Sequence, residues 1–252
     1  MICEEALALE SHRRLDTSRL RIACSNCSLR DLCVPMGLDR QDLARLDAVV
    51  QKSGTIQSGD HLFSVGDEFH ALYAVRSGCF KTYTIDRAGR EQVLGFHLPG
   101  ELLGLDAIAS ARHQCNAIAL DTASSCVMPF QDITQLAAQV PSLQRQMFRL
   151  LSENIAQSHA LAGDYSADER LAAFLLGLSE RFIRRGYSST EFNLTMPRRD
   201  IANYLRLATE TVSRVFNRFQ KNGLIEVERR QIRLVDLEGL RDLASSALLQ
   251  VA

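Results

Sequence analysis

The sequence is poor in features that mark several protein classes. Its 252 residues contain no tryptophan and only five prolines, and 29 Lys and Arg residues nearly balance 30 Asp and Glu residues. With 46% hydrophobic and 23% charged residues, the composition is typical of a globular protein and excludes a disordered or collagen-like chain. Because the net charge is −1, any positively charged surface for nucleic acid must be local.

Long apolar segments are also missing. No run approaches the roughly 18 consecutive apolar residues of a membrane span. The first 14 residues already hold five acidic or basic residues, which a secretory signal does not. We therefore expect a cytoplasmic protein without a membrane partner, in which cysteines stay reduced. The odd count of seven cysteines then argues against a disulfide framework.

The motifs of common enzyme sites are absent as well. The six histidines form no HExxH pattern, and there is no Walker or GxSxG string. No nucleophile is accompanied by a base. We therefore expect that the protein is not an enzyme.

Glycines gather in one part of the chain, where eight of the 14 lie between residues 54 and 104. Short runs with strand character alternate with them, at residues 62–65, 72–75, 80–85, 92–96, 117–120 and 126–130. This pattern predicts an all-β roll or barrel, which we place at residues 51–131.

The period then changes from strand to helix. Over residues 132–163 turn residues nearly vanish, and apolar residues such as Leu143, Met147, Ile155 and Leu161 recur at helical spacing. A single long helix with an apolar seam is predicted, with Pro141 as a plausible entry signal. Periodicity alone leaves two interpretations open: the seam packs on the β-roll, or it pairs with a second copy of the chain.

The remaining residues, 164–252, predict a second domain. A helix over 168–185 precedes a short helix from Pro197, a turn through Leu207 and Ala208, and a helix of about 14 residues that ends at Asn222. Strand-like residues 224–228 and 231–235 follow. This order is that of a winged helix-turn-helix.

The second helix of this motif carries a polar stripe that includes Glu210, Ser213 and Arg214. A solvated face is the ordinary alternative. However, residues 197–235 contain nine Arg and Lys against four acids, an excess of five that can neutralise phosphates. The carboxylate, hydroxyl and guanidinium also match the groups on base edges. We expect double-stranded DNA as partner, with Arg199 and Arg218 as further contacts.

Three cysteines, Cys24, Cys27 and Cys33, form a compact C-x2-C-x5-C cluster. Three thiolates at this spacing are typical ligands of a soft metal. Spacing leaves three alternatives open: a 4Fe–4S cluster with a distant fourth ligand, a zinc site, or a thiol switch without metal.

Several strings now resemble the cyclic-AMP receptor and Fnr (Crp/Fnr) superfamily of bacterial transcription regulators, over nearly the whole chain. Within it, the pattern Glu-x-x-Ser-Arg at residues 210–214 is similar to the oxygen-responsive Fnr branch. The other strings that carry the resemblance are YAVRSGCFKTYTI (73–85), GFHLPGELLGLDAI (95–108), DERLAAFLLGLSERF (168–182) and DIANYLRLATETVSRVFNRFQKNGLI (200–225).

The resemblance implies an α+β fold: an N-terminal double-stranded β-helix, or jelly-roll, sensor domain, a long dimerisation helix and a C-terminal winged helix-turn-helix. It divides the chain into a cluster-ligand segment (1–50), the β-roll (51–131), the dimerisation helix (132–163) and the DNA-binding domain (164–252). It also implies a homodimer that binds an inverted repeat similar to TTGAT and activates or represses genes of anaerobic or microaerobic metabolism. Contact with RNA polymerase is expected through an exposed loop such as 86–90.

For the cysteines, the resemblance implies a 4Fe–4S cluster on Cys24, Cys27 and Cys33, with Cys126 of the string CVMPF as fourth ligand and Cys115 as its rival. Cys3 and Cys79 are expected to have no role. No cyclic nucleotide is expected, because Gln114 and Cys115 stand where nucleotide-binding members have an arginine for the phosphate. The alternative is a regulator of the same fold without iron, which senses through zinc-bound or redox-active thiols.

Overall fold

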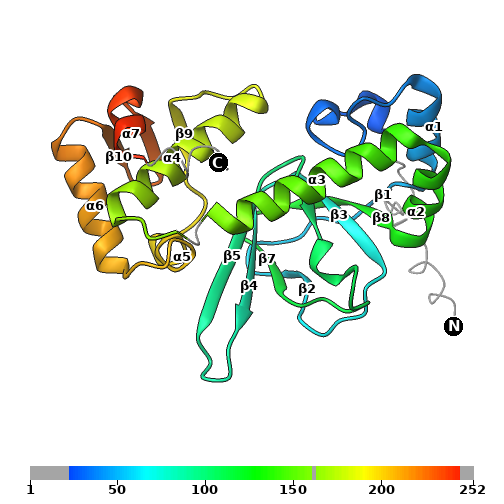
Figure 1. The fold of residues 1–252 in the computed structure, drawn as a ribbon, viewed down its shortest axis with the longest axis horizontal. Coiled ribbons are helices and arrows are strands. Elements are labelled where there is room, and N and C mark those ends of the chain that lie inside the picture. Colours follow the sequence, from blue (N-terminus) through cyan, green and yellow to red (C-terminus); the bar gives the residue numbers. More distant parts are fainter. Residues whose placement is uncertain (1–22, 161–162, 245–252) are drawn as a thin grey trace, which may run out of the picture.

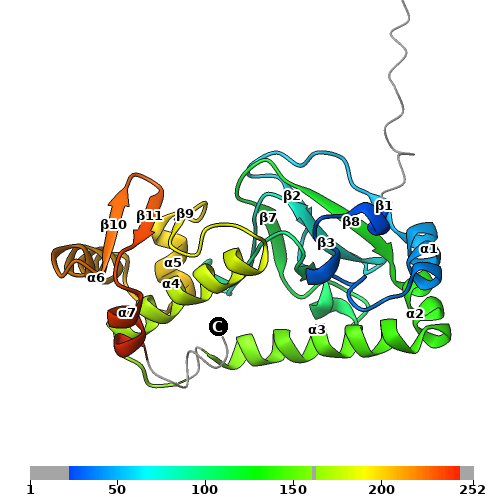
Figure 2. The same cartoon turned by 90° about the horizontal axis from the view of Figure 1, so that it is seen from above.

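The structure, a computed structural model, describes residues 23–160 and 163–244. Figure 1 shows a β-roll beside a C-terminal domain, with helix α3 (Pro141–Ala160) running along the roll toward that domain. An N-terminal loop and helix α1 (Arg40–Val49) lie at the far end of the roll (Figure 2). This arrangement confirms the fold expected from the sequence. No helix in this described part of the chain is long and apolar enough to cross a bilayer.

The β-roll consists of two antiparallel four-stranded sheets, with strand orders β1-β8-β3-β6 and β2-β7-β4-β5. A core of buried residues such as Phe80, Leu103 and Ala117, each no more than 2% exposed, holds them together. The strands are β1 (Gln51–Lys52), β2 (His61–Phe63), β3 (Ala71–Ser77), β4 (Phe80–Ile85), β5 (Glu91–His97), β6 (Leu102–Leu103), β7 (Asn116–Ala119) and β8 (Ser124–Pro129). Short 3₁₀ helices are η2 (Cys24–Asn26), η3 (Arg30–Leu32) and η4 (Leu105–Ala107).

The single helix predicted for residues 132–163 is wrong, because the segment forms two helices. Helix α2 (Phe130–Gln139) ends at Val140, whose φ of −126° and ψ of 90° are not helical, and α3 begins at Pro141. The proline is the cause, since its ring disfavours a helical conformation of the preceding residue and its nitrogen has no hydrogen to donate. Leu161 of the predicted seam, like Cys3, lies outside the described residues.

The apolar residues of α3 divide between two faces. Leu143, Met147 and Leu150 pack in a hydrophobic cluster with the N-terminal loop, α1 and α2. Phe148 and Ile155 instead are 62% and 57% exposed. One set therefore packs within the subunit, as the first interpretation of the seam expects, and the other set stays at the surface.

The C-terminal domain is a winged helix-turn-helix built on a long first helix. That helix begins with a capping box, in which Ser166 Oγ accepts from the Glu169 N–H at 3.2 Å and the Glu169 carboxylate accepts from the Ser166 N–H at 2.8 Å. The three strands form an antiparallel sheet of order β10-β11-β9. The elements are α4 (Ala167–Arg184), β9 (Glu191–Asn193), α5 (Arg198–Tyr204), α6 (Thr209–Lys221), β10 (Ile225–Glu228), β11 (Gln231–Leu234) and α7 (Leu237–Leu243).

Polar contacts join this domain to the edge of the β-roll. Lys81 Nζ in β4 lies 2.7 Å from Glu91 Oε1 and 2.9 Å from Asp200 Oδ2 at the start of α5. Asn203 of α5 pairs with the edge strand β5, because its Oδ1 accepts from the Val93 N–H at 2.7 Å and its Nδ2 donates to the Glu91 carbonyl at 2.6 Å. The first helix of the helix-turn-helix is thereby fixed to the roll.

Candidate functional site

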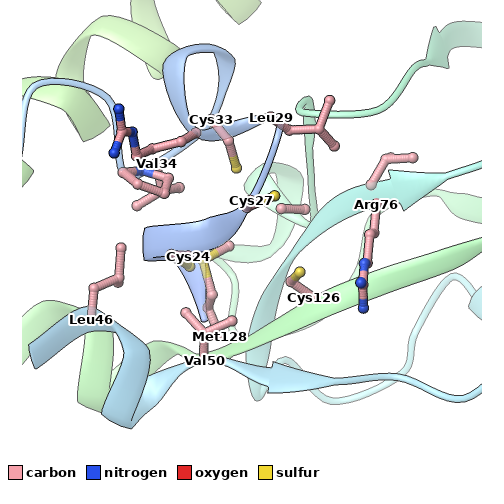
Figure 3. Close-up of a pocket in the computed structure, with 14 residues that line it drawn as sticks. Cys24, Cys27, Leu29, Cys33, Val34, Leu46, Val50, Arg76, Cys126 and Met128 are labelled. Carbon is pink, nitrogen blue, oxygen red and sulfur yellow. The ribbon is translucent and has the colours of Figure 1, made fainter. Parts of the chain in front are cut away.

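Four cysteines line one pocket at the end of the β-roll, which we call the cysteine pocket. Cys24, Cys27 and Cys33 come from the N-terminal loop, and Cys126 comes from β8. Figure 3 shows these side chains grouped around the same space, with Arg76 at its edge. The structure thus brings together the three cysteines of the motif and the fourth cysteine that the resemblance implied.

The rest of the lining is mainly apolar. It includes Val34, Leu46, Val50, Ala74, Val75 and Met128. Arg30 and Arg76 also line the pocket. A mainly apolar wall lowers the local dielectric, which strengthens electrostatic interactions beside it. A group bound there is therefore held mainly by sulfur.

Short turns and one aspartate shape the cysteine loop, residues 24–33. The Cys27 N–H donates to the Cys24 carbonyl at 3.2 Å and closes the first turn. Asp47 of α1 accepts from the Cys24 N–H and from Ser25 Oγ, the latter at 3.0 Å. Helix α1 therefore orients the start of the C-x2-C-x5-C motif. The sequence pattern does not predict this helix.

Helix α3 contacts the other end of the loop. Gln146 is 7% exposed, and its Nε2 donates to the Cys33 carbonyl at 3.2 Å. Arg149 Nη1 lies 3.1 Å from Met36 Sδ, just beyond the loop. Because a buried polar group that loses its partner costs about 1–3 kcal/mol, α3 and Cys33 are expected to move together.

Burial raises the pKa values of three thiols in this pocket. The pKa of Cys33 is raised to about 12 by burial and by the charges of Cys126 and Cys27, against a hydrogen bond from its backbone neighbour. Burial raises the pKa of Cys126 to about 11, with Cys27 adding to the effect and Arg76 opposing it. The pKa of Cys24 also rises, mainly through burial. Near neutral pH these thiols ionise when a cationic group binds them in place of the protons.

The donor set fits an iron–sulfur cluster. Four Cys thiolates are the usual ligands of a 4Fe–4S cluster, and the pocket offers four cysteines that would hold one. In residues 23–160 and 163–244, no three Cys, His, Asp or Glu side chains are arranged to hold a single metal ion. The feature that matches a cluster is that four cysteines line one pocket.

The other described cysteines lie elsewhere. Cys115 is 4% exposed in the core of the roll, with its Sγ 3.5 Å from Asp106 Oδ2. Cys79 is 1% exposed and belongs to the hydrophobic cluster shared with the C-terminal domain. The structure does not bring the rival ligand Cys115 to the cysteine pocket.

Gln114 and Cys115 stand where we expect no arginine to bind a phosphate, and both lie beside the carboxylate of Asp106. The Gln114 N–H donates to Asp106 Oδ2 at 2.7 Å, and the Gln114 side-chain amide donates to Ser110 Oγ and to the Arg112 carbonyl. The same Asp106 carboxylate lies beside Cys115. A negative charge at this place is unfavourable for a phosphate.

Helix α6 presents the polar face expected from the sequence. Glu210, Ser213 and Arg214 are exposed, whereas Val212 and Phe216 on the opposite face are 0% and 3% exposed. Within the described part of the chain, neither Glu210 nor Arg214 has an ion-pair partner. Both side chains are therefore available to a partner molecule.

The two further arginines expected to contact DNA differ in their surroundings. Arg199 at the start of α5 is 77% exposed at its side chain and lies 3.6 Å from Asp200. Arg218 of α6 is half-exposed and pairs with Asp168 of α4. Phosphate binding by Arg218 therefore has to compete with a carboxylate of the same subunit.

Sequence reasoning missed two residues that position these sites. Arg198 counts in the sequence only as one local positive charge, yet its guanidinium lies 3.5 Å from the centre of the Phe216 ring and fastens α5 to α6. Burial lowers the pKa of Arg198 to about 10. Gln146 is not singled out by the sequence either. Both depend on contacts between separate elements, for which no motif or period gives a signal.

Comparisons with known proteins agree with this fold. A Crp-like helix-turn-helix domain matches residues 169–243, and a cyclic nucleotide-binding domain matches residues 54–140. The chain is 43% identical over 240 residues to the "Anaerobic regulatory protein" of Haemophilus influenzae, which covers 94% of this chain and 93% of the relative. It is 44% identical over 235 residues to the "Fumarate and nitrate reduction regulatory protein" of Escherichia coli K12, with 92% and 94% covered.

Solved structures show the same architecture. FixK2 from Bradyrhizobium japonicum has a TM-score of 0.72 and 25% identity, and the match covers 79% of this chain and 98% of that chain. A transcriptional regulator of the CRP family from Thermus thermophilus has a TM-score of 0.63 and 22% identity, over 78% and 98%. The relatives are named as regulatory proteins, which confirms that the chain is not an enzyme. Identity of this extent over more than nine-tenths of the chain shows that it belongs to the Crp/Fnr family of DNA-binding transcription regulators.

Proposed function

We propose that this protein regulates transcription in response to oxygen through a 4Fe–4S cluster held by Cys24, Cys27, Cys33 and Cys126. The observation that carries the proposal is that these four cysteines line one largely apolar pocket. The names of the relatives, which refer to anaerobic regulation and to fumarate and nitrate reduction, support control of genes of anaerobic or microaerobic metabolism.

A bound 4Fe–4S cluster supplies a redox-active centre that oxygen can convert or destroy. The residues of this chain decide how it is held. The apolar wall limits the access of water, and Arg76 places a positive charge near the Cys126 thiolate. Solvent access and charges around the sulfurs tune the potential of such a centre.

The exposed face of α3 supports a homodimer. Phe148 and Ile155 lie seven residues apart, which is about two helical turns, and both are more than half exposed. Leu151 lies between them on the same side of the helix. A stripe of this kind is suited to a matching stripe on a second copy of the chain. Since Gln146 ties α3 to the Cys33 backbone, the cluster can influence this pairing.

The DNA-binding residues follow from the exposed polar face. Arg214 pairs with a guanine, Glu210 accepts from a cytosine amino group and Ser213 adds a hydrogen bond, while Arg199 and Arg218 bind phosphates. Two recognition helices in a dimer read half-sites one helical turn apart, so the target is an inverted repeat of the TTGAT type. We place this activity in the cytoplasm, where the exposed turn 86–90 contacts RNA polymerase at activated genes.

Analysis of anaerobically purified protein tests the proposal. We expect about four iron and four sulfide ions per chain, with a visible absorption band that air removes. Zinc without sulfide would instead support the zinc-bound form of this regulator. Full DNA binding without metal or sulfide would support a thiol switch.

A further inference from the structure

The cysteine loop contacts the β-roll at a tight turn, residues 98–101, between β5 and β6. Gly100 in this turn has a φ of +93°, and a Cβ added to it would lie 3.2 Å from Leu32 Cβ and 3.6 Å from the Leu32 carbonyl oxygen. The two backbones therefore approach so closely that a side chain at position 100 would press on the loop.

The same turn is tied to the wall of the cysteine pocket. The Gly100 N–H donates to the Val75 carbonyl at 2.8 Å, and the Val75 N–H donates to the Glu101 carbonyl at 2.9 Å. Val75 lines the pocket. A change in the pocket thus reaches the turn through both the loop and the strand.

The DNA-binding domain holds the opposite side of the turn. Glu101 accepts from Arg181 Nη2 and from Arg185 Nη2, each at 2.6 Å, and Arg185 Nε donates to the Pro99 carbonyl at 2.7 Å. The side chain of Arg185 is 4% exposed and that of Arg181 is 18% exposed. Charge-assisted hydrogen bonds in such a dry place are short and directional, so the turn and α4 are coupled.

Helix α4 is also part of the core that carries the recognition helix. Leu171, Leu175 and Leu178 of α4 belong to the same buried cluster as Val212 and Phe216 of α6. Close-packed cores transmit small displacements rather than absorb them. Movement of α4 therefore moves α6.

We propose that the 98–101 turn is a relay that couples the cysteine loop to the DNA-binding domain within one subunit. Leu32, Gly100 and Glu101 are its positioning residues. This inference rests on the proposed function and adds to it a second route, separate from the Gln146 contact to α3. When the cysteines are ligated, the cysteine loop is fixed and Leu32 stays in contact with Gly100. The ion pairs of Glu101 with Arg181 and Arg185 then fix α4. Ligation therefore shifts the population toward one position of α6.

Hydrogen exchange measured separately in α3 and α4 tests the relay. In the wild-type chain loaded with iron and sulfide under anaerobic conditions, exchange slows in both helices relative to the metal-free chain. Leu32→Gly removes the Cβ that lies over Gly100. We expect this variant to leave the iron content and the protection of α3 unchanged, and to reduce the protection of α4 about tenfold. Equal protection of α4 in the Leu32→Gly and wild-type chains would overturn the relay.

A matched pair of glycine substitutions provides the second arm. Gly100→Ala introduces a Cβ against Leu32, whereas Gly66→Ala introduces one at a similar φ of +89° with nothing within 4 Å. We expect Gly100→Ala to uncouple α4 as Leu32→Gly does, and Gly66→Ala to behave as wild type. Identical exchange of α4 in both glycine variants would contradict the proposal.

The metal-free chains separate this inference from the proposed function. If the wild-type chain binds no iron, the cluster proposal fails, but the contact between loop and turn still predicts faster exchange of α4 in the Leu32→Gly chain than in the Gly66→Ala chain. Equal exchange in these two metal-free chains would overturn the relay whatever the iron content.

Discussion

The cysteine pocket and the recognition helix α6 differ in how they are built. The pocket is assembled from segments far apart in the chain, and burial raises the pKa values of three of its thiols, those of Cys24, Cys33 and Cys126. The residues of α6 that we propose to bind DNA lie on one short helix, and Glu210 and Arg214 are exposed. The charge of the cysteine pocket, the proposed sensor, therefore depends on the group bound there. The polar face of α6, which we call the reader, exposes its side chains with or without that group.

This difference indicates where regulation acts. Because the polar side chains of α6 are already exposed, we expect DNA binding to be controlled by the position of this helix. Placement depends on α3, through Gln146, and on α4, through Glu101.

Loss of one pocket cysteine should abolish cluster binding. Cys126→Ala is expected to lower the iron content from about four ions per chain to less than about one, because a cluster left with three thiolates is poorly held. Cys115→Ala is the matched control, since Cys115 is also buried but lies outside the pocket. Iron and sulfide analysis on anaerobic protein measures the effect. Loss of iron in the Cys115 variant with retention in the Cys126 variant would reverse the assignment.

A charge on the exposed face of α3 should separate the subunits. Phe148→Glu is expected to reduce dimerisation, and with it the affinity for an inverted repeat, by about a hundredfold, because two linked contacts bind more tightly than one. Ile85→Glu places the same charge at a similarly exposed apolar residue, 57% exposed, in β4. Sedimentation of both variants gives the dimer fraction. Equal dimer fractions would exclude α3 as the dimer interface.

Acid should weaken the connection between the roll and α4. Burial alone would raise the pKa of Glu101, but the charge and hydrogen bonds of Arg181 lower it from 4.5 to about 2. A lowered carboxyl pKa contributes stability that is complete above pH 4.5 and is lost as the pH falls toward 2. We expect metal-free wild-type protein to lose on the order of 3 kcal/mol over this range through Glu101.

Denaturant unfolding at several pH values measures that loss. Glu101→Gln is less stable at neutral pH, because two arginines lose a carboxylate partner, but its stability falls less steeply in acid. Parallel pH profiles for the variant and the wild type would show that Glu101 does not carry the effect.

Removal of Arg214 from α6 should have the smallest of these effects, a loss of free energy of DNA binding. Arg214→Ala is expected to weaken binding to a TTGAT-type site by about 1–3 kcal/mol and to relax specificity at one base pair. Arg241→Ala removes an exposed positive charge from α7 as a control. Titration of duplexes with each base at every position of the half-site measures both effects. Uniform weakening across all bases would mean that Arg214 binds a phosphate.

The local parts of the fold could be predicted from the sequence. The strand predicted at residues 80–85 coincides with β4, and the two helices and wing of the C-terminal domain lie where turn residues and apolar periodicity placed them. The strands β1 and β6 have two residues each and show no period, so no pattern could indicate them. Pro141 indicates the start of α3. The end of α2 could not be predicted, because apolar residues recur at helical spacing on both sides of Pro141.

The long-range parts could be predicted only in part. Spacing pointed to Cys24, Cys27 and Cys33, but Cys126 came from the family resemblance, because nothing local connects a strand to a distant loop. The Lys81 to Asp200 pair and the Glu101 to Arg185 pair join residues that are far apart in the chain, and each residue alone resembles an ordinary surface charge. The connection between the domains is therefore visible only in the structure.

The most direct test of the account is the DNA affinity of one anaerobic sample before and after exposure to air. A cluster-bound protein should bind a duplex with the inverted TTGAT repeat, and should bind it at least about tenfold more weakly once air has removed the iron–sulfur absorption band. Unchanged affinity after complete loss of that band would contradict the account, because the sensor would then have no influence on the reader.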